Sequence, residues 1–402
     1  LNNHAACLHK LAKFSSAVRA QQLALDLLLD GFPDAPRGVS ACALLWQSLG
    51  SVQASIALQT QLFNLAIYQL CLNPSDHSFL ALILAHYSSN SEFWLNHSRR
   101  STFWSGSPCD EIIIWDDQGY GDTIQNLYWL NEAARRVKRV RLWLRPTLLP
   151  LVRERLSLPA HCSLDVMTAD STPWSESTSQ IPLYYLPFVL RAWPLPESAA
   201  RAPYFTRAQP ASLGRSMRVG LVWSAGHHRA PQPERCARER DVPFHDFWSL
   251  ALRWKALSGC TLLSLQLEGC DHGLPAEAIA SGQLIQAVES NDWLSTLEHL
   301  ESLDLFVTVD TSVAHLAGAI GLPTVLLLPC PAEWRWGQEG CQTPLYSAMH
   351  LARCSQPGDW SQALLQADRW MATRLEIQSS VSITKHDSQT LPCSSAATSN
   401  PD

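Results

Sequence analysis

Residues 303–329 read LDLFVTVDTSVAHLAGAIGLPTVLLLP, and this stretch decides the fold of the chain. The apolar run Leu305–Val309 predicts a buried strand that ends at Asp310. A helix is expected to follow, and Gly321 can end it in the left-handed backbone conformation. Pro323 then precedes a second apolar run that predicts another buried strand. The stretch is therefore expected to form one strand-helix-strand unit.

The start of this predicted helix is a candidate anion site. Thr311 or Ser312 caps the helix, whose first-turn amides lack partners within the helix and point outward. A phosphate would fit there. His315 follows one turn later on the same face, so it either contacts the anion or is a core histidine with satisfied hydrogen bonds. Small residues that let the helix press close on a sheet are Ala314, Ala317, Gly318 and Ala319.

A second unit of the same kind lies upstream. Residues 111–115 predict a strand, and residues 140–144 predict the strand that returns beside it. Between them, residues 124–137 carry apolar side chains at helical spacing. Two nucleotide-binding types of fold are therefore expected in the chain.

The turn after the first of these strands carries the candidate catalytic group. It reads DDQGYGDT over residues 116–123, and Gly119 and Gly121 permit a tight backbone there. Asp122 stands at the expected helix start. Its carboxylate either serves chemistry or simply caps a helix that begins at Thr123.

Composition limits the class of protein. At 402 residues, with 46% hydrophobic and 16% charged residues, the chain can build roughly two or three packed domains. The net charge of -6 and the lack of a long Lys/Arg run speak against nucleic acid or an anionic membrane as the main partner. No apolar run reaches the length of a membrane span, and no secretory leader opens the chain. A cytoplasmic protein is expected. The first residue is Leu rather than Met, so a preceding segment, including a leader, is the alternative.

Four regions are expected along the chain. Residues 1–100 predict helices without strands, and their pattern resembles tetratricopeptide repeats, with a plain helical cap as the alternative. Residues 108–205 predict a first Rossmann-like lobe, with strands near residues 111, 139 and 163. Residues 214–374 predict a second one, and residues 375–402 have the polar composition of a disordered tail. The Pro-rich segment between the lobes predicts a connector.

The second lobe shows the alternation of strands and helices that is typical of a doubly wound, mostly parallel sheet. Its strands are predicted at residues 217–223, 261–266, 283–287, Leu305–Val309, Thr324–Leu328 and Met349–Arg353. Ligands of such sheets sit beyond the carboxyl ends of the strands, where Asp310 and the loop from Ser224 are expected.

Residues 112–360 resemble the glycosyltransferase module that is found attached to tetratricopeptide repeats, itself similar to the heptosyltransferase family of two-lobed GT-B enzymes. The motifs that carry the resemblance stand in the family's order. They are DQGYGDTIQ at residues 117–125, VGLVW at 219–223, SLQ at 264–266, VDTSVAHLAG at 309–318, EWRW at 333–336 and GDW at 358–360.

The resemblance implies that a hexosyl or heptosyl group passes with inversion from a nucleotide-diphosphate donor to an acceptor hydroxyl. It makes the first lobe the acceptor side and the second lobe the donor side. Asp122 matches the family's Gly-Asp motif, whose carboxylate is the proposed base. The acceptor is expected to be a protein, peptide or glycan that the N-terminal helices engage.

The donor site is expected to draw on several loops of the second lobe. Thr311, Ser312 and His315 would hold the diphosphate, and Gln266 ends a strand that points to the same cleft. Asp310 is expected to be structural or a hydrogen-bond partner of the neighbouring loop. Trp334 or Arg335 would stack on the nucleotide base, unless these two side chains only pack the loop.

The loop after the strand 217–223 contains Gly226, two histidines and four arginines, of which Arg240 is the candidate for a cationic clamp. It departs from the family, which has an Asn-containing loop where this chain has AGHH at residues 225–228, and an Arg-Ser pair where this chain has Arg240-Asp241. A solvated charged loop is therefore the alternative.

No metal or other cofactor is expected. No Asp-x-Asp pair lies in a suitable loop, and a helix dipole can stabilise the diphosphate in place of a cation. The 12 cysteines are scattered without Cys-x-x-Cys spacing, which favours reduced thiols. Two other hypotheses remain: a repeat-bearing interaction scaffold with an inactive GT-B fold, and a nucleotide-sugar epimerase.

Overall fold

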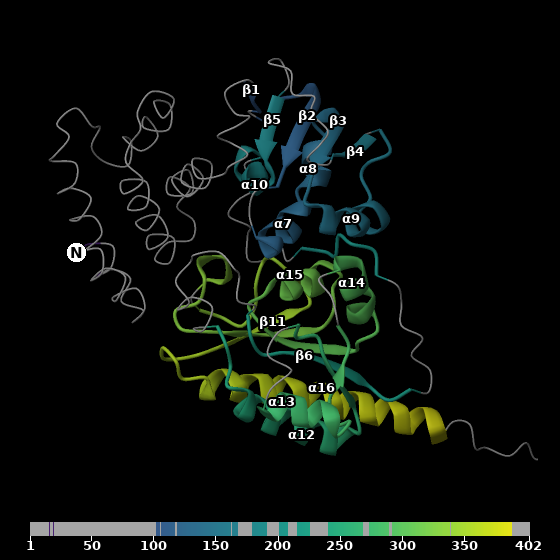
Figure 1. Cartoon of the computed structure of the whole chain (residues 1–402), viewed down its shortest axis with the longest axis vertical. Helices are drawn as coiled ribbons and strands as arrows, with labels where there is room; N and C mark the ends of the chain where they lie inside the picture. Colours follow the sequence, from purple (N-terminus) through teal and green to yellow (C-terminus); the bar gives the residue numbers. More distant parts are fainter. Residues whose placement is uncertain are drawn as a thin grey trace, which may run out of the picture.

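The computed structural model describes residues 102–104, 106–116, 119–161, 163–167, 179–190, 201–207, 215–225, 240–267, 273–288, 292–337 and 339–387, together with Ser16 and Arg19. The predicted repeats in residues 1–100 therefore lie outside the described residues, apart from those two. The rest forms two α/β lobes, each built on one parallel sheet (Figure 1). The predicted α/β class with parallel sheets is confirmed.

The first lobe has a five-stranded parallel sheet in the order β1-β5-β2-β3-β4. Its central strand is buried along most of its length, because Ile112, Ile113, Ile114 and Trp115 are all fully buried. The strands are β1 (Thr102–Phe103), β2 (Cys109–Trp115), β3 (Val137–Trp143), β4 (Ser163–Met167) and β5 (Ser179–Pro182). The helices are α7 (Tyr120–Leu127), α8 (Leu130–Ala134), α9 (Leu149–Arg155) and α10 (Leu186–Val189), with 3-10 turns η2 (Pro146–Leu148) and η3 (Leu183–Tyr185).

The helix predicted over residues 124–137 is two helices, α7 and α8. The first begins earlier than expected, at Tyr120, and the break falls at Tyr128 and Trp129. There the two aromatic rings pack edge to face with centroids 5.0 Å apart, and both stack against the guanidinium of Arg201. Aromatic residues have a modest helix propensity, so tertiary packing decides the local backbone.

The second lobe has a six-stranded parallel sheet in the order β11-β10-β9-β6-β7-β8. All six strands fall within the stretches that the sequence predicts. They are β6 (Arg218–Val222), β7 (Thr261–Ser264), β8 (Ile285–Gln286), β9 (Leu305–Val309), β10 (Thr324–Leu328) and β11 (Met349–Arg353). The helices are α12 (Phe244–Ser258), α13 (Gly273–Ala280), α14 (Trp293–Glu301), α15 (Ser312–Ala319) and α16 (Ser361–Asp387), with the 3-10 turn η4 (Trp334–Trp336).

Each sheet has a topological switch point, where the strand order changes direction. In the second lobe the chain runs outward from β6 to β8 and then returns to the other side of β6 with β9. In the first lobe it runs from β2 to β4 and returns to β2 with β5. Ligands of open parallel sheets bind beyond the carboxyl ends of such neighbouring strands. Asp116 follows β2 there, and Asp310 follows β9.

The C-terminal boundary differs from the prediction. Helix α16 runs from Ser361 to Asp387, so the expected lobe end at residue 374 and tail start at residue 375 fall inside a helix. Its first part packs on α12, where the Asp368 carboxylate accepts hydrogen bonds from Arg253 and from the indole of Trp254.

Two expectations based on composition can be compared with the described residues. No helix among them is long and apolar enough to cross a membrane. The five cysteines that are described, Cys109, Cys260, Cys330, Cys341 and Cys354, form no disulfide.

Candidate functional site

The two lobes meet where helix α7 faces helix α15 (Figure 1). Each helix follows the carboxyl end of a central strand, so both candidate turns lie at this interface. Gly121 makes the contact possible. A Cβ atom at Gly121 would lie 2.8 Å from Cδ2 of His315 and 3.4 Å from Cα of Ser312, which is closer to the ring than real Cβ atoms come. The backbone of α7 therefore rests directly on the first turn of α15.

The amino end of α15 keeps the features of an anion site. Thr311 is the cap, and its hydroxyl accepts a hydrogen bond from the amide of Ala314 at 3.4 Å. The amides of Ser312 and Val313, at the first two helical positions, have no acceptor within the helix. Both residues are only partly buried, whereas the rest of α15 is buried. The open end of the helix therefore faces the junction of the lobes.

Arg240 lies beside the same strand end. Its Nη1 donates to the carbonyl oxygen of Asp310 at 3.2 Å and lies 3.8 Å from the Asp310 carboxylate, which is buried. The side chain of Arg240 keeps about a third of its surface exposed. Arg240 thus places a positive charge next to the α15 turn. Gly226 and the other basic residues of the predicted clamp loop lie outside the described residues.

Gln266 follows β7 and contacts the backbone after β6. Its side chain is almost fully buried, and Oε1 accepts hydrogen bonds from the amides of Trp223 at 3.3 Å and Ser224 at 3.0 Å. Asp241 completes this support, because its Oδ1 accepts from the amide of Ala225 at 2.8 Å. Gln266 therefore holds the backbone that follows β6, and a direct donor contact stays a prediction.

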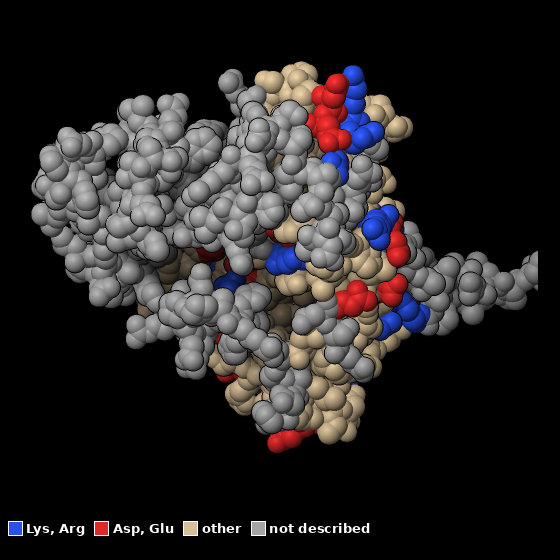
Figure 2. Space-filling model, turned by 45° about the horizontal axis from the view of Figure 1, so that its top comes forward, with Lys and Arg blue, Asp and Glu red and all other residues tan. Residues whose placement is uncertain are grey.

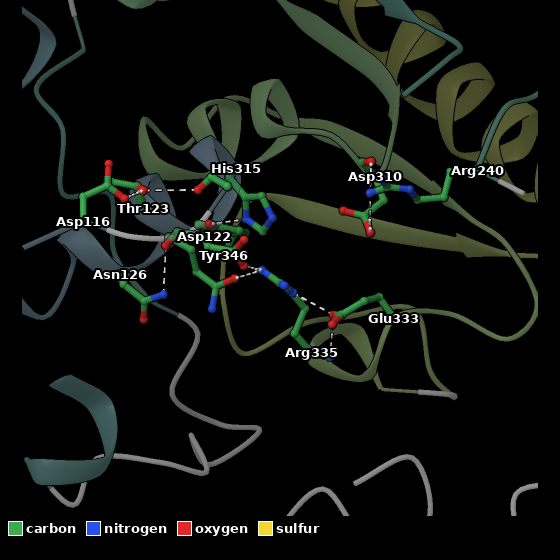
Figure 3. A network of polar contacts seen from close by, with 12 residues as sticks. Asp116, Asp122, Thr123, Asn126, Arg240, Asp310, His315, Glu333, Arg335 and Tyr346 are labelled. Atoms are coloured by element: carbon green, nitrogen blue, oxygen red, sulfur yellow. Dashed lines mark hydrogen bonds and ion pairs between the residues drawn. The ribbon is translucent and has the colours of Figure 1, made fainter. Parts of the chain in front are cut away.

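Asp122 is the third residue of α7. The helix begins at Tyr120 with Gly119 at the cap position and no side-chain cap, so the alternative that Asp122 caps a helix beginning at Thr123 is wrong. Its Oδ1 accepts a hydrogen bond from Nη1 of Arg335 at 2.6 Å (Figure 3). About a fifth of its side chain, 22%, is exposed. The carboxylate therefore lies in the interface between the lobes and points at the second one.

Arg335 connects the two lobes. Its Nε donates to Oε2 of Glu333 at 2.6 Å on its own loop, and its Nη1 donates both to Asp122 and to Oε1 of Gln125 at 3.1 Å (Figure 3). Burial opposes the charge of Arg335, but Asp122 and Glu333 outweigh it and raise its pKa well above the usual value. The guanidinium is thus held by carboxylates, and stacking on a nucleotide base stays a prediction. The side chain of Trp334 is not among those described.

His315 is packed inside the interface. The ring is buried, its Nδ1 lies 2.8 Å from the hydroxyl of Tyr346, and it stacks on Trp336 with ring centroids 5.1 Å apart. This is the arrangement of the core-histidine alternative. Burial, and after it the charges of Arg335, Arg201 and Arg240, lower the pKa of His315 well below its ordinary value of 6.5. The ring is therefore neutral near neutral pH, and a phosphate contact stays a prediction.

The lowered pKa of His315 predicts acid sensitivity. Below pH 6.5 the unfolded chain binds a proton at this residue that the folded chain does not bind. The free energy of unfolding therefore decreases as the pH is lowered. The slope from one such group is at most about 1.4 kcal/mol per pH unit. We expect His315→Gln to reduce the loss of stability between neutral pH and pH 5 in urea titrations.

His245 provides the matched control, because its side chain is exposed at the start of α12. The interpretation would fail if His245→Gln changed the acid dependence as much as His315→Gln. It would also fail if His315→Gln kept the wild-type slope.

A buried network behind the turn at residues 116–123 was not predicted. The carboxylate of Asp116 is 1% exposed and pairs with Nε of Arg145 at 2.8 Å, and it also accepts from the hydroxyl of Thr123 at 2.5 Å. Arg145 in turn covers the ring of Tyr120, which packs on Trp293 of the second lobe with centroids 5.1 Å apart. An acidic residue directly after a buried strand was the available signal. The network holds the first turn of α7 in place.

The connector between the lobes contributes a second support. The hydroxyl of Tyr204 donates to the carbonyl of Ile124 in α7 at 2.7 Å, and its amide donates to the carbonyl of Ala319 in α15 at 2.9 Å. Pro203 packs where a Cβ at Gly321 would lie, 2.6 Å from its Cγ. Gly321 has φ +68, as predicted for the residue that ends α15. The connector thus fixes α7 and α15 relative to each other.

Charged side chains gather near the middle of one face of the molecule, beside a recess (Figure 2). The described residues contain no group of three or more His, Cys, Asp or Glu side chains that could hold a metal ion. The groups that converge on the interface are a helix amino end, guanidinium ions and carboxylates. Such a set suits an anion with a nearby proton acceptor, and metal independence stays a prediction.

Comparisons with known proteins give distant structural likenesses only. No family model matches the chain, and no curated protein matches it significantly. Among solved structures, a family 9 glycosyl transferase from Veillonella parvula is similar at 10% identity and a TM-score of 0.44, covering 68% of this chain and 99% of that one. The E. coli heptosyltransferase WaaC with ADP has 12% identity and a TM-score of 0.44, covering 66% and 99%. A Thermobaculum terrenum O-GlcNAc transferase mutant has 13% identity and a TM-score of 0.27, covering 93% and 91%. Likenesses this remote assign no activity.

Proposed function

We propose that this protein is a glycosyltransferase that moves a sugar from a nucleotide-diphosphate donor to an acceptor hydroxyl. One observation carries the proposal. The carboxylate of Asp122 and the open amino end of α15 come from different lobes and meet at one interface, joined by Gly121. Sugar transfer needs a proton acceptor on one side of the reacting carbon and a stabilised leaving group on the other.

The second lobe would hold the leaving diphosphate. The amides of Ser312 and Val313 are oriented donors, and the dipole of α15 adds partial positive charge at the same end. Arg240 adds a full positive charge beside Asp310. These groups bind a diphosphate more tightly as negative charge develops on it, so they stabilise the transition state more than the bound donor. No metal is needed for this arrangement.

The first lobe would supply the base. Asp122 takes the proton of the acceptor hydroxyl while the acceptor oxygen forms a bond to the anomeric carbon. The bond from that carbon to the diphosphate breaks, and the diphosphate leaves with the electron pair. A single displacement from the opposite face inverts the configuration. We further propose that residues 1–100 engage the acceptor, which is a protein, a peptide or a glycan.

The direct test is a thermal-shift and calorimetric panel of nucleoside diphosphates and nucleotide sugars. A ligand that binds only the folded chain stabilises it by about 2.7 kcal/mol at a hundred times its dissociation constant. We expect at least one nucleoside diphosphate, but not its parent nucleoside, to raise the melting temperature. The interaction-scaffold hypothesis predicts that none does.

Ser312→Pro is the matched variant for this panel. Proline is favoured at the first helical position, and the extended backbone of Thr311, with φ -141 and ψ 167, is compatible with a following proline. The change therefore removes one open amide and preserves the helix. We expect diphosphate affinity to fall roughly ten- to hundredfold, since a hydrogen bond to a charged group contributes about 1.5–3 kcal/mol. Unchanged affinity would place the diphosphate elsewhere. Conversion of a nucleotide sugar without any acceptor would favour an epimerase.

A further inference from the structure

Arg335 lies beside the expected base, Asp122, and near the helix that is expected to bind the diphosphate. It belongs to the second lobe, yet its shortest contact outside its own loop, 2.6 Å, is with the carboxylate of Asp122 in the first lobe. Asp122 directly follows Gly121, whose backbone rests on His315 and Ser312 of α15. The cation therefore lies beside the expected base and near the helix that is expected to hold the diphosphate.

The contacts of Arg335 divide into an anchor and a movable end. Glu333 holds Nε at 2.6 Å and also accepts from the backbone amide of Arg335 at 3.0 Å, so the base of the guanidinium is fixed to its own loop. Nη1 reaches across to Asp122 and Gln125. Nη2 has no hydrogen-bond partner among the described residues. The outer end of the side chain can therefore change partners while the anchor stays.

We propose that Arg335 is a donor-sensing latch: it covers the carboxylate of Asp122 in the ligand-free protein and releases it when a diphosphate enters. The proposal rests on the proposed function and adds a regulatory step to the same site. An acceptor cannot use the base until the donor is in place.

Electrostatics favours the exchange. A carboxylate offers one negative charge to the guanidinium, whereas a diphosphate offers at least two and several acceptor oxygens in the geometry that arginine binds in a bidentate manner. The open amides of α15 bring the diphosphate to the same place. Once Nη1 and Nη2 bind phosphate oxygens, Asp122 loses its partner and becomes free to accept a proton.

Chemical labelling measures how far Arg335 shields the carboxylate of Asp122. A water-soluble carbodiimide with glycine ethyl ester modifies accessible carboxyl groups, and peptide mass spectrometry gives the rate at each one. In ligand-free protein we expect Arg335→Gln to raise the labelling rate of Asp122 roughly tenfold, which corresponds to about 1.4 kcal/mol. Asp110 is the internal standard for an intact fold, because its side chain is 85% exposed and lies at the other end of β2.

Two further variants distinguish the proposed latch from a general weakening of the interface between the lobes. Arg155→Gln breaks a second ion pair that joins the lobes within the described ranges, with Glu301, whose oxygens lie 3.0 and 3.3 Å from the guanidinium. It should leave Asp122 labelling as in wild type. Arg335→Lys keeps the charge but cannot hold Glu333, Asp122 and Gln125 together, so an intermediate rate is expected. If Arg155→Gln exposes Asp122 as much as Arg335→Gln does, the latch is disproved.

The second arm adds the nucleoside diphosphate that gives the largest thermal shift, with inorganic pyrophosphate as the base-free probe. We expect labelling of Asp122 to rise in wild type and to stay unchanged in Arg335→Gln. A diphosphate that binds by calorimetry yet leaves wild-type labelling unchanged or lower overturns the latch alone. If no nucleoside diphosphate binds, the latch and the proposed function fall together.

Discussion

Replacing Asp122 with Asn is expected to lower the rate of sugar transfer by about 10² to 10⁴-fold, because a positioned general base contributes that much. Donor affinity should not fall, because Arg335 leaves a neutral amide at least as readily as a carboxylate. The amide oxygen of Asn can still accept a hydrogen bond from Arg335, which lies 2.6 Å from the carboxylate in the wild-type protein. The nucleotide panel identifies the donor, and product analysis identifies the acceptor. The measurements are then initial rates over a range of donor concentrations and calorimetry of the free nucleoside diphosphate.

Asp110→Asn is the control for this experiment. Asp110 is an exposed aspartate that pairs with Lys138 at the amino end of β2, whereas Asp122 follows the carboxyl end of the same strand. The control variant should keep wild-type rates. Wild-type turnover in Asp122→Asn would rule out this carboxylate as the base. Loss of diphosphate binding in that variant would instead assign Asp122 to the donor site.

Gly121→Ala is expected to separate the lobes at the point where they touch. The new Cβ would lie 2.8 Å from Cδ2 of His315, and that ring cannot retreat easily because it lies between Trp336 and Tyr346. Overpacking of a tight contact costs about 1–3 kcal/mol, so we expect that loss in the free energy of unfolding. Diphosphate affinity should fall as well, because α15 shifts relative to α7. Urea denaturation and calorimetry measure the two effects.

A double-mutant cycle tests whether the clash with His315 is the cause. His315→Ala removes the ring that the new methyl group meets, so Gly121→Ala should cost at least about 1 kcal/mol less in that background than in wild type. Additive effects of the two changes would show that the cost of Gly121→Ala arises elsewhere, for example from the backbone of α7.

The strands of the second sheet were predictable because parallel strands buried on both faces are continuous apolar runs. Leu305–Val309 and Thr324–Leu328 are buried at every position. Strand β1, with two residues, and strand β5, with the sequence SQIP, carry no such signal. They form because β5 pairs in parallel with β2, a tertiary contact that no local pattern records.

The site was predictable in its turns and not in its side-chain pairings. Thr311 as the cap of α15 follows from local chemistry, because a hydroxyl before a helix accepts its free amides. The ion pair between Arg335 and Asp122 joins residues 213 positions apart, so only the docking of two lobes creates it. For Gln266, the sequence predicted the position of the residue but not the contacts of its side chain. Its position at a strand end was correct, but the nearby backbone amides already use its side-chain oxygen.

Tyr204 has a consequence for how the molecule comes apart. A single residue bonds to α7 with its hydroxyl and to α15 with its amide, at 2.7 and 2.9 Å. Melting either lobe alone would break one of these hydrogen bonds, each worth about 0.5–1.5 kcal/mol, and expose the surface that Tyr204 covers. The two lobes should consequently unfold in one cooperative transition. The melting temperature of the protein then also reports the strength of the contact between α7 and α15.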